Sequence, residues 1–162
     1  MEETSNNILN GRSACLSCVK TLINMAKHQV FIINQNLEAD LYHHRDIYDH
    51  LSEMATQNRK TDIRIVAHDT QVATTNGHYL ILLAQKLPTF AGIRITSNPE
   101  HKKFRESWLI IDDMALMRLK HPLRYEGYFE LDNRLECRSL TDEFIDIWEA
   151  SKPDQNTRRL SL

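Results

Sequence analysis

Apolar and polar residues follow two different periods along this chain, and the periods predict an order of helices and strands. Leu9, Leu16 and Leu22 belong to a stripe with spacings of three, four and seven residues, which predicts a helix. The same helical period recurs further along, so that the predicted helices span residues 9–27, 45–58, about 75–87 and 133–150. Short β-branched or alternating runs predict strands at residues 30–34, 62–68, 92–96, 107–112, 115–120 and 125–133.

Local signals fix several boundaries between these elements. Thr75 and Asn76 are typical helix-capping residues, and Pro88 stops the helix that they begin. Asp112-Asp113 stands between two apolar runs and predicts a hairpin turn. Residues 36–45 and 98–104 carry neither period, so we expect irregular connections there.

The order of elements predicts an α/β fold. Helices and strands alternate in the first part of the chain, and a β-rich segment and a closing helix follow. We expect a mixed sheet, mostly parallel, with helices on both faces. Residues 30–34, 63–67 and 93–96 should form adjacent parallel strands.

The bulk composition describes one ordinary globular domain. The chain has 162 residues, 41% of them hydrophobic and 26% charged, with a formal net charge of −2. This charge gives no global attraction for nucleic acid, although it leaves room for a local basic patch. We expect residues 1–13 to be partly disordered, residues 14–150 to form the domain and residues 151–162 to form a tail.

Neither a membrane span nor a secretory signal is visible in the sequence. No apolar run approaches the ~18–20 residues that cross a bilayer. The first residues, "MEETSNNILNGRSA", lack a basic stretch followed by an apolar core. These features predict a cytoplasmic protein without membrane contact, in which the cysteines are thiols.

Residues 14–150 resemble one half of a phospholipase D-type fold. The resemblance rests on the helices that lead into "VFIIN" and "DIRIVAH", on the hairpin "SWLIIDDMALMRL" and on the closing helix "LTDEFIDIWEAS". In that family the active strand reads His-any-Lys, four residues, Asp, and then six residues before Gly-Ser-any-Asn. The resemblance implies a phospholipase D-like fold and a site at the start of the hairpin.

The catalytic motif of that family is lost here except for its aspartate. With the aspartate placed on Asp112, Arg105 stands at the histidine, Ser107 at the lysine, Leu119 at the glycine and Pro122 at the asparagine. The family forms a covalent phosphohistidine, which needs a neutral imidazole as the nucleophile. A guanidinium has no usable lone pair, and a serine cannot supply the lysine's charge. We therefore expect no enzymatic activity and no cofactor.

The basic residues around the degenerate motif are candidates for binding a phosphate or another anion. Arginine suits this role because its guanidinium offers a bidentate fork of N–H donors. Arg105 can equally be a surface residue paired with Glu106 or Asp112. The candidates for binding an anion are Lys103, Arg105, Ser107, Arg118 and Arg124, and those for binding nucleic acid also include Lys102 and Lys120.

Histidines and carboxylates near the second helix are the densest group of metal-type residues. They are His43, His44, Asp46, Asp49 and His50. A divergent metal-dependent hydrolase would use such a group. The other interpretation is a solvated helix start, because acids in the first turn favour the helix dipole.

Three further features have a chemical and a structural interpretation. Cys15 and Cys18 form a Cys-x-x-Cys pair on a predicted helix; packing is the preferred interpretation, and redox or zinc chemistry is the alternative. His68-Asp69 ends a strand at the edge of the sheet where α/β sites usually lie, or is simply a loop. Residues 76–78 can bind an anion through backbone N–H groups at a helix start.

The sequence leaves open three functions. The first is a non-catalytic phospholipase D-like module for binding or assembly. The second is a binder of nucleic acid or another phosphoryl ligand, and the third is the metal-dependent hydrolase. Catalytic members of the family combine two halves, so the resemblance implies a homodimer, or a partner domain or protein. Trp108, Met114 and Met117 are the residues that we expect at a self-association surface.

Overall fold

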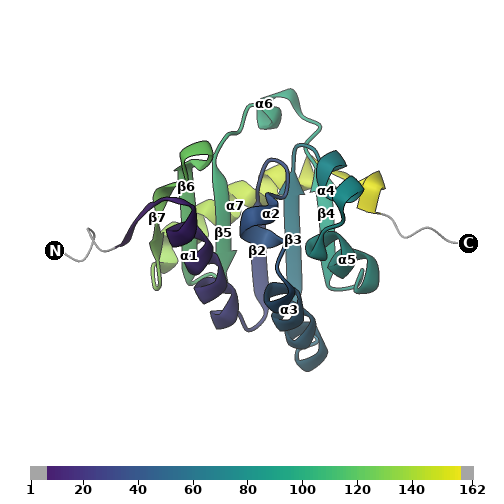
Figure 1. Cartoon of the computed structure of the whole chain (residues 1–162), viewed down its shortest axis with the longest axis horizontal. Helices are drawn as coiled ribbons and strands as arrows, with labels where there is room; N and C mark the ends of the chain where they lie inside the picture. Colours follow the sequence, from purple (N-terminus) through teal and green to yellow (C-terminus); the bar gives the residue numbers. More distant parts are fainter. Residues whose placement is uncertain (1–6, 158–162) are drawn as a thin grey trace, which may run out of the picture.

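The computed structural model describes residues 7–157, and these form one open sheet with helices on both sides (Figure 1). The strands lie in the order β1-β7-β6-β5-β2-β3-β4-β8. They are β1 (Ile8–Asn10), β2 (Gln29–Ile33), β3 (Asp62–Ala67), β4 (Ala91–Ile95), β5 (Ser107–Ile111), β6 (Ala115–His121), β7 (Glu126–Glu130) and β8 (Lys152–Pro153). The helices are α1 (Arg12–Met25), α2 (Ala39–Tyr42), α3 (Arg45–Gln57), α4 (Gln71–Asn76), α5 (Tyr79–Lys86), α6 (Pro99–Lys102) and α7 (Arg134–Glu149), with short 3₁₀ turns η2 (Pro122–Arg124) and η3 (Gln155–Thr157).

The prediction that β2, β3 and β4 are adjacent and parallel is confirmed. β2 pairs in parallel with β3, and β3 pairs in parallel with β4. The apolar run of β2 is almost continuous, because its residues face helices on both sides. In β3 and β4 the apolar residues alternate with Arg64 and Arg94, which lie over the Trp148 ring of α7. The α/β class with helices on both faces is therefore confirmed.

The expectation that most of the sheet is parallel is wrong. Of the seven neighbouring strand pairs described, β2–β3 and β3–β4 are parallel and the other five are antiparallel. The reason is the β5–β6–β7 meander, which docks on the open edge of β2 with β5 antiparallel to it. Hairpin connections between consecutive strands force this direction.

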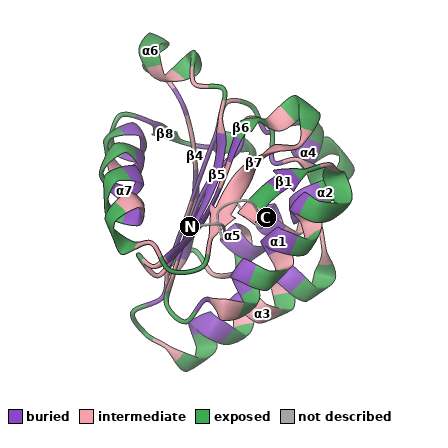
Figure 2. Cartoon of the chain, turned by 90° about the vertical axis from the view of Figure 1, so that its left-hand side faces the viewer, coloured by how far each residue is buried: buried purple, intermediate pink, exposed green. Residues whose placement is uncertain are grey.

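The two faces of the sheet are covered unequally. Figure 2 shows α7 alone on one face, while α1, α2, α3, α4 and α5 lie on the other. Beneath α7, Phe31 stacks on Phe144 with ring centroids 4.8 Å apart, and Trp148 continues the aromatic cluster. The apolar residues of the opposite face form a second, larger core with α1, α3 and α5.

Two predicted helices are shorter than their hydrophobic periods suggested. Leu9 lies in β1 rather than in the first helix, which begins after Gly11 at φ 107°. The helix expected at about 75–87 is two helices, because Gly77 at φ 82° ends α4. α5 then begins at Tyr79 with His78 as its N-cap, so Thr75 and Asn76 are not caps.

The segments expected to be irregular contain short helices, and the described parts of both termini contain strands. α2 lies within residues 36–45, and α6 lies within residues 98–104. β1 pairs antiparallel with β7, and β8 pairs antiparallel with β4. Residues 1–6 and 158–162, which belong to the predicted disordered N-terminus and tail, lie outside the described residues.

The hairpin turn at Asp112-Asp113 is confirmed. Both residues have positive φ, 53° and 55°, and Met114 N–H donates to the Ile111 carbonyl at 2.8 Å. Positive φ at both central positions is what a type I′ turn requires, and aspartate tolerates it better than most residues. The turn fixes the register in which Ser107 lies opposite Leu119.

Candidate functional site

A pocket of about 560 Å³ opens at the end of β2, beside η2 and the residues that lead into β5. This is the carboxyl edge of the parallel strands, where α/β proteins commonly bind ligands. The pocket volume lies within the range of small-molecule sites, roughly 300–1,000 Å³. The lining residues that carry its polar chemistry are Asn34, Glu38, Arg105, Lys120, Arg124 and Tyr125.

Ser107 lies beneath this pocket rather than in its wall. Its side chain is fully buried, and its hydroxyl accepts a hydrogen bond from the Asn34 amide at 3.0 Å. The Asn34 carbonyl oxygen accepts in turn from the backbone N–H of Glu38 at 2.9 Å. Asn34 therefore covers the position that corresponds to the family's lysine.

Arg105 is exposed at the pocket and makes no ion pair among the described residues. Its guanidinium donates to the backbone carbonyls of Lys102 at 2.5 Å and Phe104 at 3.0 Å. The expected pairing with Glu106 or Asp112 is wrong, because both carboxylates are occupied elsewhere. The positive charge of Arg105 is thus held at the pocket without a neutralising partner.

Glu106 is occupied by Arg118 on the α7 side of the sheet. Arg118 Nε lies 2.7 Å from Glu106 Oε1, and its NH1 nitrogen lies 3.7 Å from Glu136. The guanidinium also lies 5.6 Å above the Trp108 ring. These contacts raise the pKa of Arg118 through the Glu106 hydrogen bond and lower the pKa of Glu106 despite its partial burial. Arg118 is a structural residue that does not line the pocket.

The remaining candidates divide between the pocket and the surface. Arg124 lines the pocket from η2, with a loose 4.0 Å contact to Glu126. Lys103 pairs with Glu100 at 3.5 Å and lies outside the pocket. Lys120 lines the pocket, but its ammonium lies 6.0 Å above the Tyr128 ring. The predicted basic residues therefore do not all converge: Arg105, Lys120 and Arg124 line the pocket, whereas Lys103 and Arg118 do not.

Two residues that the sequence did not single out, Glu38 and Tyr125, also line the pocket and form its acidic wall. The Tyr125 hydroxyl donates to the Glu38 carboxylate, and this bond raises the pKa of Tyr125 to about 12. Partial burial raises the pKa of Glu38. Tyr125 adopts a left-handed φ of 55°, which a bulky residue rarely does. The pair joins segments 87 residues apart, so no local pattern in the sequence could reveal it.

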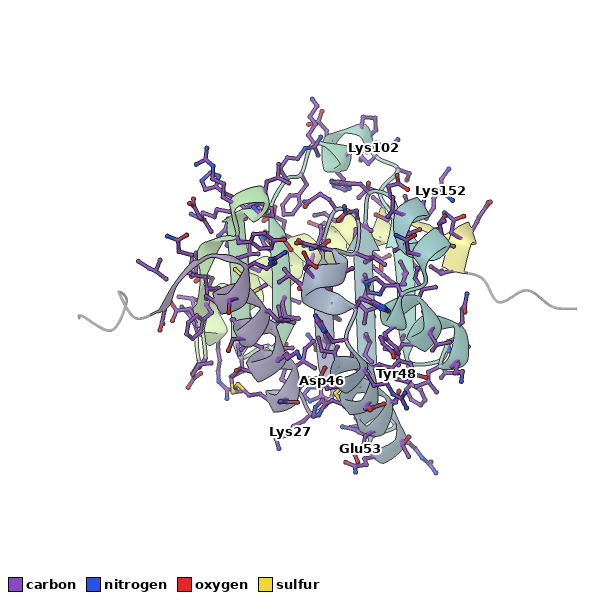
Figure 3. The ribbon with its side chains drawn as sticks, in the orientation of Figure 1. Lys27, Asp46, Tyr48, Glu53, Lys102 and Lys152 are labelled. Atoms are coloured by element: carbon purple, nitrogen blue, oxygen red, sulfur yellow. The ribbon has the colours of Figure 1, made fainter. Side chains whose placement is uncertain are left out.

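Asp112, the one motif residue that the chain retains, is far from this pocket. Its carboxylate accepts hydrogen bonds from the backbone N–H groups of Lys27, His28 and Gln29 at 2.8–3.1 Å. Figure 3 shows Lys27 at the opposite end of the molecule from Lys102 of α6. Asp112 therefore fastens the hairpin to the start of β2 and does not line the pocket.

A second pocket of about 490 Å³ adjoins the first and shares Gln35, Asn36 and Arg105 with it. His68, which lines it, has Nε2 2.7 Å from the Phe104 carbonyl and Nδ1 2.7 Å from the Thr96 hydroxyl. Since a carbonyl only accepts, Nε2 carries the proton and Nδ1 accepts from Thr96. His68 fastens the segment that carries Arg105 to the ends of β3 and β4.

The predicted group of metal-type residues is dispersed among separate partners. Asp46 pairs with Lys20 at 3.1 Å, and Asp49 pairs with Arg45 at 3.4 Å. His50 Nε2 lies 3.2 Å from the Ala26 carbonyl. Within residues 7–157, His, Cys, Asp and Glu side chains form no group of three suited to a metal. The structure thus offers no support for the metal-dependent hydrolase.

The predicted anion site at residues 76–78 is also occupied from within the chain. Leu80 N–H donates to His78 Nδ1, and Tyr79 N–H donates to His43 Nδ1, both at 3.0 Å. These two imidazoles satisfy the N–H groups at the start of α5 that an anion would use.

Cys15 and Cys18 are buried on α1, and burial raises their thiol pKa values to about 11 and about 12, which fits packing.

The family described as "Domain of unknown function (DUF7931)" matches residues 11–160 of this sequence. The chain belongs to the DUF7931 family. No protein among the curated ones matches it. Within residues 7–157, no helix combines the length and apolar content needed to cross a bilayer.

Solved structures resemble this DUF7931 chain in fold. Nuc from Salmonella typhimurium, a phospholipase D family member, aligns with a TM-score of 0.58 and 15% identity over 88% of this chain and 90% of its own. NucT from Helicobacter pylori aligns with a TM-score of 0.57 and 14% identity over 88% and 92%. The archaeal chromatin protein TrmBL2 aligns with a TM-score of 0.63 and 14% identity over 91% of this chain. The chain spans only 53% of TrmBL2, whose structure shows a mode of DNA binding.

These neighbours establish the phospholipase D-like fold of the DUF7931 chain. The match extends over 90% of Nuc and 92% of NucT. At 14–15% identity the likeness concerns the fold alone. What this chain does must therefore be argued from its own pocket.

Proposed function

We propose that this chain is a non-catalytic phospholipase D-like module that binds a small anionic ligand, with a phosphoryl group as the best fit, in the pocket beside Arg105. One observation carries the proposal. The Arg105 guanidinium lines a pocket of about 560 Å³, and no described carboxylate neutralises it. The residue stands where the resembling family has its nucleophilic histidine.

Two features of the pocket support a non-catalytic role. A guanidinium stays protonated and cannot attack phosphorus. Ser107, at the position of the family's lysine, is fully buried and hydrogen-bonded to Asn34. A phosphoryl group that entered this pocket would find a site for binding but neither a nucleophile nor the second cationic group of the motif.

The arginine pair supports an anion, and phosphoryl oxygens in particular. Arg105 and Arg124 approach the pocket from different segments of the chain, one before β5 and one in η2. Guanidinium groups bind phosphate through paired N–H donors, and such charge-assisted bonds are about twice as strong as neutral ones. The backbone carbonyls of Lys102 and Phe104 hold Arg105 in place before any ligand arrives.

A longer polyanion such as single-stranded nucleic acid is a second candidate. The observation in its favour is the adjoining pocket, which continues past Arg105 to Lys102. Against it, Arg118 is neutralised by Glu106, Lys103 pairs with Glu100, and the net charge is −2. A surface that tracks a nucleic-acid backbone needs a continuous run of free cations.

Calorimetric titration of the full chain tests the proposal. The probes are inorganic phosphate, propyl phosphate and a single-stranded oligonucleotide, each applied to wild type, Arg105→Ala and Lys103→Ala. Lys103→Ala is the matched control, because it removes an exposed positive charge two residues away and outside the pocket.

We expect both small phosphates to bind to the wild-type chain. Arg105→Ala should lower their affinity about tenfold or more, because it removes a charge-assisted hydrogen bond. Lys103→Ala should stay within about twofold, since an exposed ion pair is worth little. Equal losses in both variants would show a diffuse charge effect rather than a site. Tight binding of the oligonucleotide alone would favour the second candidate. Turnover of bis-p-nitrophenyl phosphate that survives Arg105→Ala would contradict the non-catalytic assignment.

A further inference from the structure

The pocket beside Arg105 carries charges of both signs. Arg105 and Arg124 supply positive charge, while Glu38 places a carboxylate in the same pocket. A site for a simple anion has no need of a carboxylate, which would repel the ligand. The presence of Glu38 therefore indicates that the ligand carries a second group besides the anionic one. This inference rests on the function proposed above.

Glu38 has no cationic partner of its own among the described residues. The nearby Arg12 pairs with Asp40 at 3.1 Å instead. Tyr125 donates one hydrogen bond to the Glu38 carboxylate, and a carboxylate has room for several more. Glu38 is also half-buried. A partly desolvated carboxylate with a single neutral donor is poorly compensated, so a cationic ligand group would stabilise it.

The carboxylate is held in a fixed place by the surrounding backbone. Glu38 N–H donates to Asn34 Oδ1 at 2.9 Å, which ties the residue to the end of β2. Tyr125 is fixed because its backbone carbonyl accepts from Gly11 N–H at 2.9 Å. The acidic wall is therefore as well anchored as Arg105, and a ligand does not have to order it on binding.

We infer that the ligand is a small zwitterion, with its anionic group held by Arg105 and Arg124 and its ammonium group held by Glu38. A compound that carries a phosphate and an amine a few bonds apart has this chemistry. The pocket of about 560 Å³ has room for such a molecule. Glu38 then acts as the residue that selects among phosphates, and Tyr125 as the residue that positions Glu38.

The test compares two phosphates of nearly equal shape. 2-Aminoethyl phosphate and propyl phosphate differ by an ammonium in place of a methyl group. Both are titrated calorimetrically into the wild-type chain, Glu38→Gln, Tyr125→Phe and Arg105→Ala. Gln keeps an oxygen that accepts from Tyr125 but loses the charge, and Phe removes the phenol while the charge remains.

We expect the wild-type chain to bind 2-aminoethyl phosphate about tenfold more tightly than propyl phosphate, as one charge-assisted contact predicts. Glu38→Gln should bring this ratio close to one, and Tyr125→Phe should lower it only in part, because Glu38 keeps its charge but loses the hydrogen bond that positions it. The inference would be overturned if the ratio of the two affinities were near one in the wild-type chain or unchanged in Glu38→Gln. The proposed binding of phosphate would not be affected by either result. If neither compound binds, or if Arg105→Ala changes nothing, the proposed function itself fails.

Sedimentation with phosphatidylethanolamine vesicles distinguishes a free zwitterion from the same group on a lipid. Pelleting that disappears in Glu38→Gln would assign the chemistry to a lipid headgroup. A protein that stays in the supernatant while binding free 2-aminoethyl phosphate would assign it to a free small molecule. Either result supports the zwitterionic class, whereas pelleting that Glu38→Gln leaves unchanged contradicts it.

Discussion

The Asn34 amide donates a hydrogen bond to the Ser107 hydroxyl at 3.0 Å, across the neighbouring strands β2 and β5. This contact closes the position where the resembling family carries its lysine. Ser107 is fully buried and Asn34 is nearly so, with 2% of its surface exposed. The packing around Ser107 thus supports the proposal of a non-catalytic module independently of the side chain at position 105.

Restoring the motif should therefore not restore hydrolysis. In the double variant Arg105→His/Ser107→Lys, the lysine would place an ammonium in a buried position sized for a hydroxyl. We expect a loss in the free energy of unfolding of at least about 3 kcal/mol, because no carboxylate compensates the charge there. Urea denaturation measures this loss, and bis-p-nitrophenyl phosphate measures turnover. Arg105→His alone is the control, and measurable turnover by the double variant would refute the prediction.

Local pattern was sufficient to predict the longer helices and strands, but not the short elements or the contacts between elements. The apolar residues of β2, β3 and β4 identified three adjacent parallel strands, because buried strand positions leave a local signal in the sequence. The direction in which β5 docks on β2 depends on contacts between residues such as Phe31 and Ile110, which lie far apart in the chain. Nothing within either strand's sequence encodes that pairing.

The candidate site likewise contains residues that the sequence identified and residues that it did not. The resemblance led to Arg105 because a motif has fixed spacing. Glu38 stands in a segment without periodicity and Tyr125 at the start of a predicted strand, and only the fold brings the two residues together. Lys103 and Arg118 illustrate the opposite error, since closeness in sequence to Arg105 or to the hairpin does not place a side chain in the pocket.

Asp112 should be among the strongest single stabilising residues outside the apolar cores. Its carboxylate accepts three backbone N–H groups at the start of β2. Asp112→Ala leaves those donors without a protein partner, and we expect a loss of about 3 kcal/mol in the free energy of unfolding. Asp113→Ala is the matched control, because Asp113 also has positive φ but accepts only from Thr141 at 3.1 Å. Equal effects in urea denaturation would mean that the turn conformation, not the carboxylate, matters.

Gly127 should tolerate no side chain. A Cβ atom there would lie 2.1 Å from the Arg118 carbonyl oxygen and 2.7 Å from the Leu119 Cα atom. Gly127→Ala must therefore push β7 away from β6, and β1 with it, since Leu9 pairs with Gly127. We expect a loss of several kcal/mol in stability by thermal unfolding. Gly92→Ala should cost far less stability, because its Cβ atom would lie 3.4 Å from the Trp148 ring.

The stability of the chain should fall in mild acid because of His78. Burial first, and then the neighbouring His43 and His44, lower the pKa of His78 from 6.5 to about 4, against an opposing contact with the Leu37 carbonyl. The folded state therefore binds a proton less readily than the unfolded state does. This contribution to stability is present above pH ~6.5 and is lost as pH falls toward ~4, on the order of 3 kcal/mol in all.

Urea denaturation between pH 7.5 and pH 4.5 measures the effect, with His78→Asn as the comparison. Asparagine can still cap α5 but does not titrate in this range. Its stability should vary less with pH over the window in which His78 titrates. Identical pH profiles for the two proteins would assign the acid sensitivity to other groups.

Self-association stays a prediction, but its expected surface has to change. Trp108 and Met117 are 1% and 0% exposed, so they fill the monomer cores and cannot face a partner. Met114, beside the hairpin turn, is only partly exposed. Leu123 of η2 lines the pocket and is 99% exposed, the highest value among the exposed large apolar residues that the structure describes, so it is the surface residue that we select for the test. We expect light scattering over a dilution series to show a mass above that of the monomer, and Leu123→Ser to lower it. Val72→Ser, at a residue 65% exposed on α4, is the control and should leave the mass unchanged. A monomer mass at every concentration would remove the prediction, and an effect of Val72→Ser alone would move the surface to α4.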